Sequence, residues 1–230
     1  LGASYVSKDS LTPTEPRWYR AEPLWTTAER QGVRTAVFFW PASLAPSADG
    51  VRPSILMRPY DDAVPDDARV DSIAAWLRRP AATRPRFVAA YVATVDKIGH
   101  RYGPDAPETD GAVVAADRLV GRLLDSLAAS PVGARVNVVV LSDHGMARVA
   151  PDPVVDLSGV LDTVGLRAVD NGPLLALHVD GPDAERRRAR AYEALRRALA
   201  RPGARARVWR RADTPVAWAL RDEPRAGDPI

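Results

Sequence analysis

Two strongly apolar runs constrain the fold of this chain more than any other feature. They are RFVAAYVATV at residues 86–95 and VNVVVLS at 136–142. A strand that is apolar on both faces is typical of a parallel sheet covered by helices on each side. A third strand is expected at 33–40, and helical patterns alternate with the strands at 22–32, 67–79 and 106–130. This alternation predicts an α/β fold with a doubly wound, mostly parallel sheet.

The character of the sequence changes near residue 151. Beyond it a strand is expected at 172–180, a helix at 183–200 and a second strand at 206–211. These elements predict a small β-α-β subdomain, or an insertion in the main sheet. We therefore expect a core over 1–150 and a β-α-β part over 151–230.

The composition limits the kinds of site that the chain can build. The chain has 230 residues and no cysteine, so any metal must be held by histidine and carboxylate side chains. No apolar run approaches the roughly 18 to 20 residues of a membrane span, so no transmembrane segment is expected in this chain. The first residue is Leu1, so the lack of a leader pattern says little about secretion.

Arginine supplies nearly all of the positive charge. The formal net charge is +3, and the densest run, ERRRARAYEALRRALARPGARARVWRR, spans 185–211. One interpretation is a patch for phosphate or nucleic acid, and the other is the solvated face of a helix. The run lacks the regular interleaving of aromatic residues that base stacking requires. The solvated face is therefore favoured, and no specific nucleic-acid binding is expected.

Residue types that bind metals follow the two apolar runs directly. Asp96 and His100 lie in TVDKIGHRYG, and Asp143 and His144 lie in SDHGM. In doubly wound sheets, ligands bind at the carboxyl ends of the strands, which is where both pairs are expected. Each pair alone could instead be a polar turn, with the aspartate capping the chain and the histidine solvated.

Taken together, the two pairs favour a metal centre. Aspartate and neutral histidine suit a metal of the zinc type. Each pair supplies only two ligands, so the pattern indicates a two-metal centre with further ligands from elsewhere. Metal ions roughly 3.5 to 4 Å apart stabilise an in-line displacement at phosphorus. The third histidine, His178, falls inside the predicted strand LALHVD and is interpreted as structural.

The order of these motifs resembles the nucleotide pyrophosphatase/phosphodiesterase family of the alkaline phosphatase superfamily. The similarity includes TVDKIGHRYGP, the long helix and VVVLSDHGM, and it extends to RAEPLWTTAERQG, VFFWPAS, PYDDAVPDDARVDSIAAWL and RAGDPI. It covers nearly the whole chain in collinear order. The resemblance implies an alkaline-phosphatase-like fold in which residues 1–150 form part of the metal-binding core.

The resemblance also implies the chemistry. The family uses two zinc ions and a threonine nucleophile to cleave phosphodiester or pyrophosphate bonds, typically in nucleotides. By resemblance, Asp96 and His100 would bind one Zn²⁺, and Asp143 and His144 the other. Tyr60 and Tyr91 match positions where the family places aromatic rings near the nucleotide base. Tyr91 could equally be a core residue of its strand.

Several parts of the family's site have no counterpart in these residues. The threonine nucleophile, a first aspartate ligand and an asparagine that holds the phosphate are expected upstream of Leu1, and a last histidine ligand downstream of Ile230. The sequence resembles the middle of a family member, and we expect this fragment to be impaired. Ala42 also departs from the family, which has glycine there. The resemblance suggests a periplasmic or extracellular location.

Other functions also fit the sequence. One is a phosphomonoesterase, or a phospholipid or phosphonate hydrolase, of the same superfamily. Another is a degenerate domain that binds nucleotides or nucleic acid through the arginine-rich run without catalysis. The degenerate domain would show salt-sensitive binding that survives Asp143→Ala, whereas a metal centre would lose zinc with that substitution.

Overall fold

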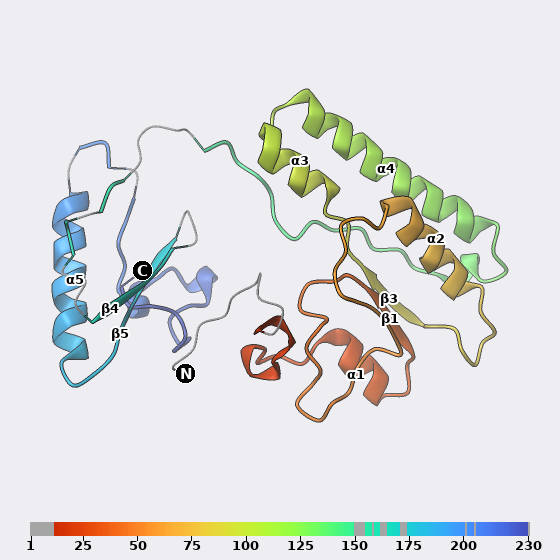
Figure 1. Cartoon of the computed structure of the whole chain (residues 1–230), viewed down its shortest axis with the longest axis horizontal. Coiled ribbons are helices and arrows are strands. Elements are labelled where there is room, and N and C mark those ends of the chain that lie inside the picture. Colours follow the sequence, from red (N-terminus) through yellow and green to blue (C-terminus); the bar gives the residue numbers. More distant parts are fainter. Residues whose placement is uncertain are drawn as a thin grey trace. The chain divides into compact units, whose positions relative to one another are not determined.

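The computed structural model describes residues 12–149, 155–157, 159–161, 165–170, 174–200, 202–204 and 206–229 (Figure 1). The chain divides into two compact units, residues 1–148 and 149–230. Each unit is described by itself.

The first unit contains a three-stranded parallel sheet with the strand order β2-β1-β3. Its strands are β1 (Thr35–Phe38), β2 (Ile55–Met57) and β3 (Phe87–Ala90). The predicted α/β fold with a mostly parallel sheet is confirmed for this unit. β2 was not predicted, because its three residues lie within the proline-rich segment 41–66, which was expected to be a loop.

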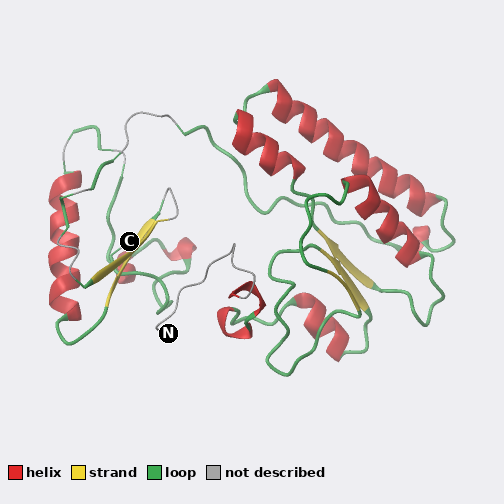
Figure 2. Ribbon diagram, viewed as in Figure 1, coloured by secondary structure: helices red, strands yellow, loops and turns green. Residues whose placement is uncertain are grey.

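Helices cover both faces of this sheet. The helix α1 lies on one face, and α2 and α4 lie on the other (Figures 1 and 2). Proline suits the first turn of α4, where its missing N–H would have no intrahelical partner. The bounds are α1 (Leu24–Arg30), α2 (Asp66–Leu77), α3 (Thr94–Tyr102) and α4 (Pro107–Ala128), with short 3-10 turns at Thr12–Thr14, Pro16–Trp18 and Gly133–Arg135.

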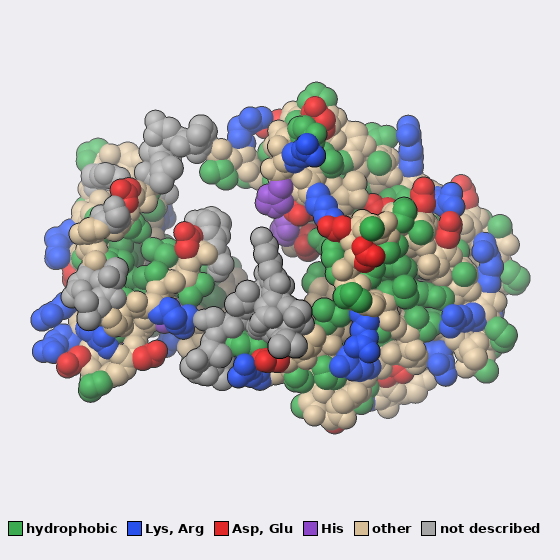
Figure 3. Space-filling model, viewed as in Figure 1, with side chains coloured by type: hydrophobic (Ala, Val, Ile, Leu, Met, Phe, Trp, Pro, Cys, Tyr) green, Lys and Arg blue, Asp and Glu red, His purple; other side chains and the backbone are tan. Residues whose placement is uncertain are grey.

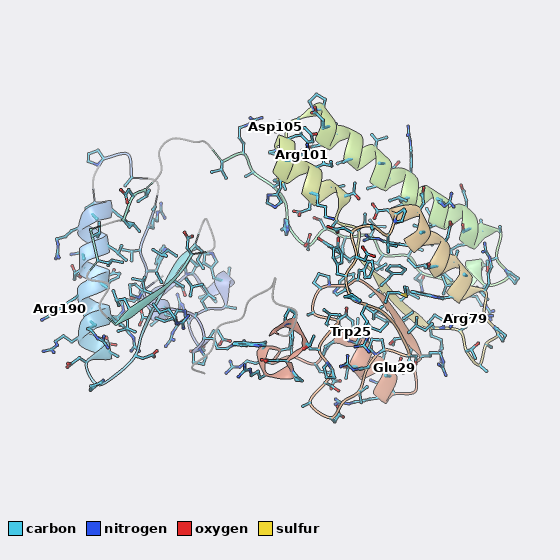
Figure 4. All side chains as sticks on the ribbon, viewed as in Figure 1. Trp25, Glu29, Arg79, Arg101, Asp105 and Arg190 are labelled. Atoms are coloured by element: carbon cyan, nitrogen blue, oxygen red, sulfur yellow. The ribbon has the colours of Figure 1, made fainter. Side chains whose placement is uncertain are left out.

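The central strand β1 is buried on both faces, and its side chains alternate between two cores. Ala36 and Phe38 pack with residues of α2 and α4, whereas Val37 packs with Trp25 of α1. Figure 4 shows Trp25 and Glu29 on α1 beside the sheet. The Glu29 carboxylate accepts hydrogen bonds from the backbone N–H groups of Thr35 (2.7 Å) and Ser54 (2.8 Å). Glu29 therefore fixes the residues that begin β1 and precede β2.

The segment 136–142, predicted to be a buried strand, is not a strand in the structure. Val136 packs against the core, but Val139 is 78% exposed and Leu141 is 64% exposed. The sequence correctly indicates an apolar segment, but a strand also needs a neighbour to bond with its backbone. Within the described residues, the sheet of the first unit consists of β1, β2 and β3, and none of them pairs with 136–142.

The second unit contains an antiparallel strand pair followed by a helix. The pair is β4 (Leu166–Asp170) with β5 (Leu175–Val179), and the helix is α5 (Ala184–Leu199). Leu177 of β5 packs against Ala191 and Leu195 of α5. The strand predicted at 172–180 and the helix at 183–200 are therefore confirmed. Short 3-10 turns follow at Arg211–Asp213 and Val216–Trp218.

The predicted β-α-β order of this part is wrong. Residues 206–210 form no strand, whereas β4 was not expected. Beside β5, two hydrogen bonds come instead from the C-terminal residues: the Leu177 N–H donates to Pro229 O at 3.0 Å, and the Asp228 N–H donates to Leu177 O at 2.7 Å. These contacts depend on residues about 50 positions apart, which a local sequence pattern does not reveal. No described helix is both long and apolar enough to cross a membrane.

Candidate metal centre

Asp96 and His100 lie on a helix, not in the polar turn that was considered for them. The helix α3 begins at Thr94, within the residues predicted to continue the strand, and ends at Tyr102. Side chains four residues apart lie on one face of a helix. The Asp96 Oδ1 and His100 Nε2 atoms are accordingly 3.4 Å apart.

Asp143 and His144 lie on a segment without helix or strand, which packs against α3 through Met146. The Met146 side chain of this segment lies against Gly99 of α3, where a Cβ atom would lie 2.6 Å from the Met146 sulfur and would displace that side chain. Gly99 is buried and belongs to the same DKIGH motif as the two candidate ligands. The glycine in that motif thus leaves space on the helix that carries Asp96 for the Met146 side chain, two residues after His144.

This packing brings the two predicted pairs together. His144 Nε2 lies 3.8 Å from Asp96 Oδ1 and 3.5 Å from Asp143 Oδ2. Figure 3 shows histidine side chains next to acidic side chains on the surface of the first unit. Asp96 is the least exposed of the four side chains and lies within 4 Å of both histidine rings.

A hydrogen bond defines which ring nitrogen of His144 is available to bind a metal ion. His144 Nδ1 is 2.9 Å from the backbone oxygen of Gly145. A carbonyl can only accept, so Nδ1 carries the proton, and in the neutral ring Nε2 keeps its lone pair. The hydrogen bond to Gly145 and the negative charges of Asp143 and Asp96 raise the pKa of His144, although desolvation partly opposes them.

Asp96 Oδ1 is a buried oxygen without a hydrogen-bond partner. Its two nearest ring nitrogens, at 3.4 and 3.8 Å, are too far away for a hydrogen bond. A buried acceptor of this kind is costly unless a proton donor or a cation satisfies it. Among the described residues, no group of three or more His, Asp or Glu side chains is arranged to hold a metal ion.

The two predicted aromatic residues lie beside this cluster. The Tyr60 ring packs edge-on against Phe39 at a centroid distance of 5.1 Å, and the residue is 40% exposed. Tyr91 follows β3 and is partly buried. Burial and the charges of Asp143 and Asp96 raise the pKa of Tyr91, so its hydroxyl lies within the field of both carboxylates.

Comparison with known proteins identifies the family. The family model described as type I phosphodiesterase/nucleotide pyrophosphatase matches residues 1–230. The chain belongs to this family. The resemblance of the DKIGH and SDHGM motifs therefore reflects true membership.

Similar proteins agree with this assignment. The chain is 36% identical over 158 residues to a venom phosphodiesterase of Crotalus durissus collilineatus, covering 69% of this chain and 19% of the relative. It is 34% identical over 184 residues to human ectonucleotide pyrophosphatase/phosphodiesterase family member 1, covering 80% of this chain and 20% of that protein. The chain thus spans about a fifth of the length of these curated relatives.

A solved structure shows the same fold. Murine ectonucleotide pyrophosphatase/phosphodiesterase 5 superimposes with a TM-score of 0.80 at 25% identity, covering 94% of this chain and 55% of the murine chain. An inactive variant of the murine protein, which superimposes equally well, was solved in complex with AMP. The alkaline-phosphatase-like fold expected from the motifs is therefore confirmed.

In this family member a buried arginine that was not predicted from the sequence supports the aromatic side of the site. Arg69 of α2 is 3% exposed and donates to Tyr91 O at 2.9 Å and to Val64 O at 3.1 Å. Its guanidinium also lies over the Phe39 ring at 5.0 Å. Arg69 precedes Ile73 by four positions, so it lies on the buried face of the helix. A charged residue on that apolar face is the signal that could have identified it.

The remaining histidine and the arginine-rich run lie in the second unit. His178 lies on β5 opposite Arg167 in the strand register, and burial lowers its pKa, as does the Arg167 charge. On α5, Arg186, Arg188 and Arg196 form ion pairs with acidic residues three positions before them. Figure 4 shows Arg190 pointing away from α5. These contacts are typical of a solvated helix face.

Proposed function

We propose that this chain supplies part of a two-zinc centre that hydrolyses phosphodiester or pyrophosphate bonds in nucleotides. The observation that carries the proposal is the buried Asp96 Oδ1, which has no hydrogen-bond partner and lies within 4 Å of the Nε2 atoms of both His100 and His144. Family membership supports the same reaction class.

The donor set fits zinc. Two imidazoles and two carboxylates form the mixed nitrogen and oxygen set that Zn²⁺ prefers, whereas calcium and magnesium favour oxygen alone. The His144 tautomer supports this fit, because the Gly145 carbonyl orients the ring and leaves Nε2 unprotonated. Asp96 and His100 would hold one ion, and Asp143 and His144 the other.

The residues of the chain would orient a phosphoryl group at this cluster. Bound zinc would polarise the phosphoryl oxygens and stabilise the charge that develops on the attacking and leaving oxygens. Arg69 would keep Tyr91 and the loop that carries Tyr60 in place, through its hydrogen bonds to Tyr91 O and Val64 O. The exposed face of Tyr60 would then stack on the base of a nucleotide.

The proposal includes residues outside this chain. The threonine nucleophile, the first aspartate ligand and the last histidine ligand would come from other parts of the parent protein, so this fragment would be impaired. Residues 1–150 would be the partial metal-binding core and residues 151–230 a subdomain of the same domain. A periplasmic or extracellular location is proposed, in keeping with relatives named as a venom phosphodiesterase and an ectonucleotide pyrophosphatase/phosphodiesterase.

Metal analysis tests the proposal at the cluster. The purified chain should bind zinc. His144→Ala should weaken the zinc affinity at least tenfold, because even the loss of a residue that only orients a metal ligand typically costs about 10- to 100-fold. His178→Ala is the matched control, because His178 lies in the second unit. Titration with a competing chromogenic chelator measures the zinc affinity of both variants. Equal zinc affinity in the His144→Ala variant would contradict the proposal.

Hydrolysis tests the reaction class and the role of the absent residues. A chromogenic nucleotide phosphodiester should be cleaved far more slowly by this chain than by the complete parent enzyme, because the nucleophile is not among its residues. Turnover at the parental rate would overturn the proposed impairment. The parent enzyme should prefer the diester to the monoester of the same nucleoside, and the opposite preference would indicate a phosphomonoesterase.

A further inference from the structure

An ion pair beside Tyr60 has no role in the proposed metal centre. Lys97 of α3 donates a hydrogen bond to Asp62 Oδ1, in the loop that carries Tyr60. Both side chains are largely exposed, 46% for Lys97 and 61% for Asp62. Lys97 directly follows the candidate ligand Asp96 in the sequence.

The fold does not depend on this pair. Exposed ion pairs typically contribute little to stability, because water screens them and two long side chains must be ordered. The same loop is already held by the buried Arg69, which donates to Val64 O. The hydroxyl of Thr94 on α3 also donates to Asp66 at the start of α2. The Asp62–Lys97 pair is therefore available for another role.

The pair lies around the hydroxyl end of Tyr60. Lys97 Nζ is 5.6 Å from the centroid of the Tyr60 ring. The hydrogen bond between Lys97 and Asp62 lowers the pKa of Asp62 and raises the pKa of Lys97, and the nearby Tyr60 side chain contributes to both shifts in the same directions. A planar base stacked on the exposed face of Tyr60 would bring one polar edge to this acceptor and this donor.

We propose that Asp62 and Lys97 read the Watson–Crick edge of a guanine base stacked on Tyr60. This inference rests on the proposed nucleotide function. Guanine presents two neighbouring N–H donors, N1–H and N2–H, followed by the O6 acceptor. A carboxylate can accept two parallel N–H bonds, and an ammonium donates to a carbonyl oxygen.

Other bases match this pair less well. Adenine presents one amino donor beside one ring acceptor, so Asp62 could accept only one hydrogen bond from it. Uracil presents a single N–H between two carbonyl oxygens, and one of these would face the carboxylate. The carboxylate keeps its capacity for the base even while Lys97 donates to Oδ1, because an ionised carboxylate offers about four acceptor sites.

Calorimetric binding of GMP, AMP and UMP to the zinc-loaded chain tests the inference. We expect GMP to bind about tenfold more tightly than AMP or UMP, the discrimination that one good bidentate contact provides. Asp62→Asn should remove the preference, because an amide cannot accept both N–H bonds. Lys97→Met should weaken GMP binding for lack of the O6 donor. Asp71→Asn is the matched control, since Asp71 also forms an exposed ion pair, with Arg122.

The outcomes separate this inference from the proposed function. Equal affinities for the three nucleotides, or a GMP preference that survives Asp62→Asn, would overturn the guanine assignment and leave the metal centre standing. Absence of zinc-dependent binding of both the nucleotides and inorganic phosphate would overturn both. A loss of preference in Asp71→Asn as well would show that the effect is not specific to Asp62.

Discussion

Single residues bring the two halves of the candidate metal centre together. The four candidate ligands could be named from the sequence because each pair follows a strongly apolar run. In the folded chain, Gly99 leaves space for the Met146 side chain beside α3, and the Gly145 carbonyl orients the His144 ring. Both contacts form only after folding. The sequence therefore predicts which residues could bind a metal, but not which ring nitrogen of His144 faces Asp96.

The backbone angle of Ala42 marks a position where the chain differs from the motif that the family resemblance implies. Ala42 has φ of 65°, in the left-handed region that favours glycine, the residue that the family resemblance implies at this position. We expect Ala42→Gly to raise the free energy of unfolding by about 0.5 to 1 kcal/mol, since relief of the left-handed strain exceeds the entropy cost of glycine. Chemical denaturation measures the change.

Ala81→Gly is the control for this prediction. Ala81 is exposed and is not among the described residues with positive φ, so glycine brings only its greater freedom in the unfolded chain. The control should be neutral or destabilising. Equal effects of the two substitutions would argue against strain at Ala42.

At the scale of elements, local patterns predicted the longer helices but not every strand. α2, α4 and α5 form where helical periodicity predicted them. The helix α3 was missed because its first residues continue an apolar run that was assigned to the preceding strand. The segment 136–142 has a strand-like sequence, yet no described strand bonds to it. Hydrophobic periodicity indicates which secondary structure a segment favours, whereas the pairing of a strand depends on the segments that lie beside it.

Substitutions of two valines test the difference between the paired strand β1 and the unpaired segment 136–142. Val37 lies in β1 and is 0% exposed, whereas Val139 is 78% exposed. Val37→Ala should lower the free energy of unfolding by about 2 kcal/mol, because it removes buried methyl groups and leaves a cavity. Val139→Ala should change it by less than about 0.5 kcal/mol, as is usual at exposed positions. Urea denaturation of both variants makes the comparison, and a large loss in Val139→Ala would show that 136–142 is buried in solution.

At the scale of the whole molecule, the candidate chemistry lies in the first unit, and the second unit is held together differently. The fold class was predictable because the apolar strands and amphipathic helices alternate along residues 33–130. The second unit was less predictable because its C-terminal segment is fixed by distant charges. Arg210 pairs with Asp228 and also with Glu185 of α5. No local sequence pattern indicates contacts across such separations.

This charge network predicts a pH dependence of stability. Burial opposes the ionisation of Asp228, but hydrogen bonds from Arg210 and from the Arg211 N–H outweigh it and lower the pKa of Asp228 below its ordinary 3.8. The stabilisation is fully present above the pKa of the unfolded chain and is lost as the pH falls through the folded pKa. We expect Asp228→Asn to destabilise the protein at pH 7 by about 1 to 2 kcal/mol.

The difference in the free energy of unfolding between the unsubstituted chain and the Asp228→Asn variant should shrink towards zero as the pH falls below 3.8. At such pH values Asp228 becomes neutral, as the substituted asparagine already is. Urea unfolding followed by tryptophan fluorescence can measure this difference, since Trp209 and Trp218 lie in the same unit with ring centroids 6.2 Å apart. Comparing each pH with the Asp228→Asn variant cancels the titration of all other carboxylates. A difference that stayed constant from pH 7 to below 3.8 would mean that the Arg210 pair does not stabilise the ionised form of Asp228.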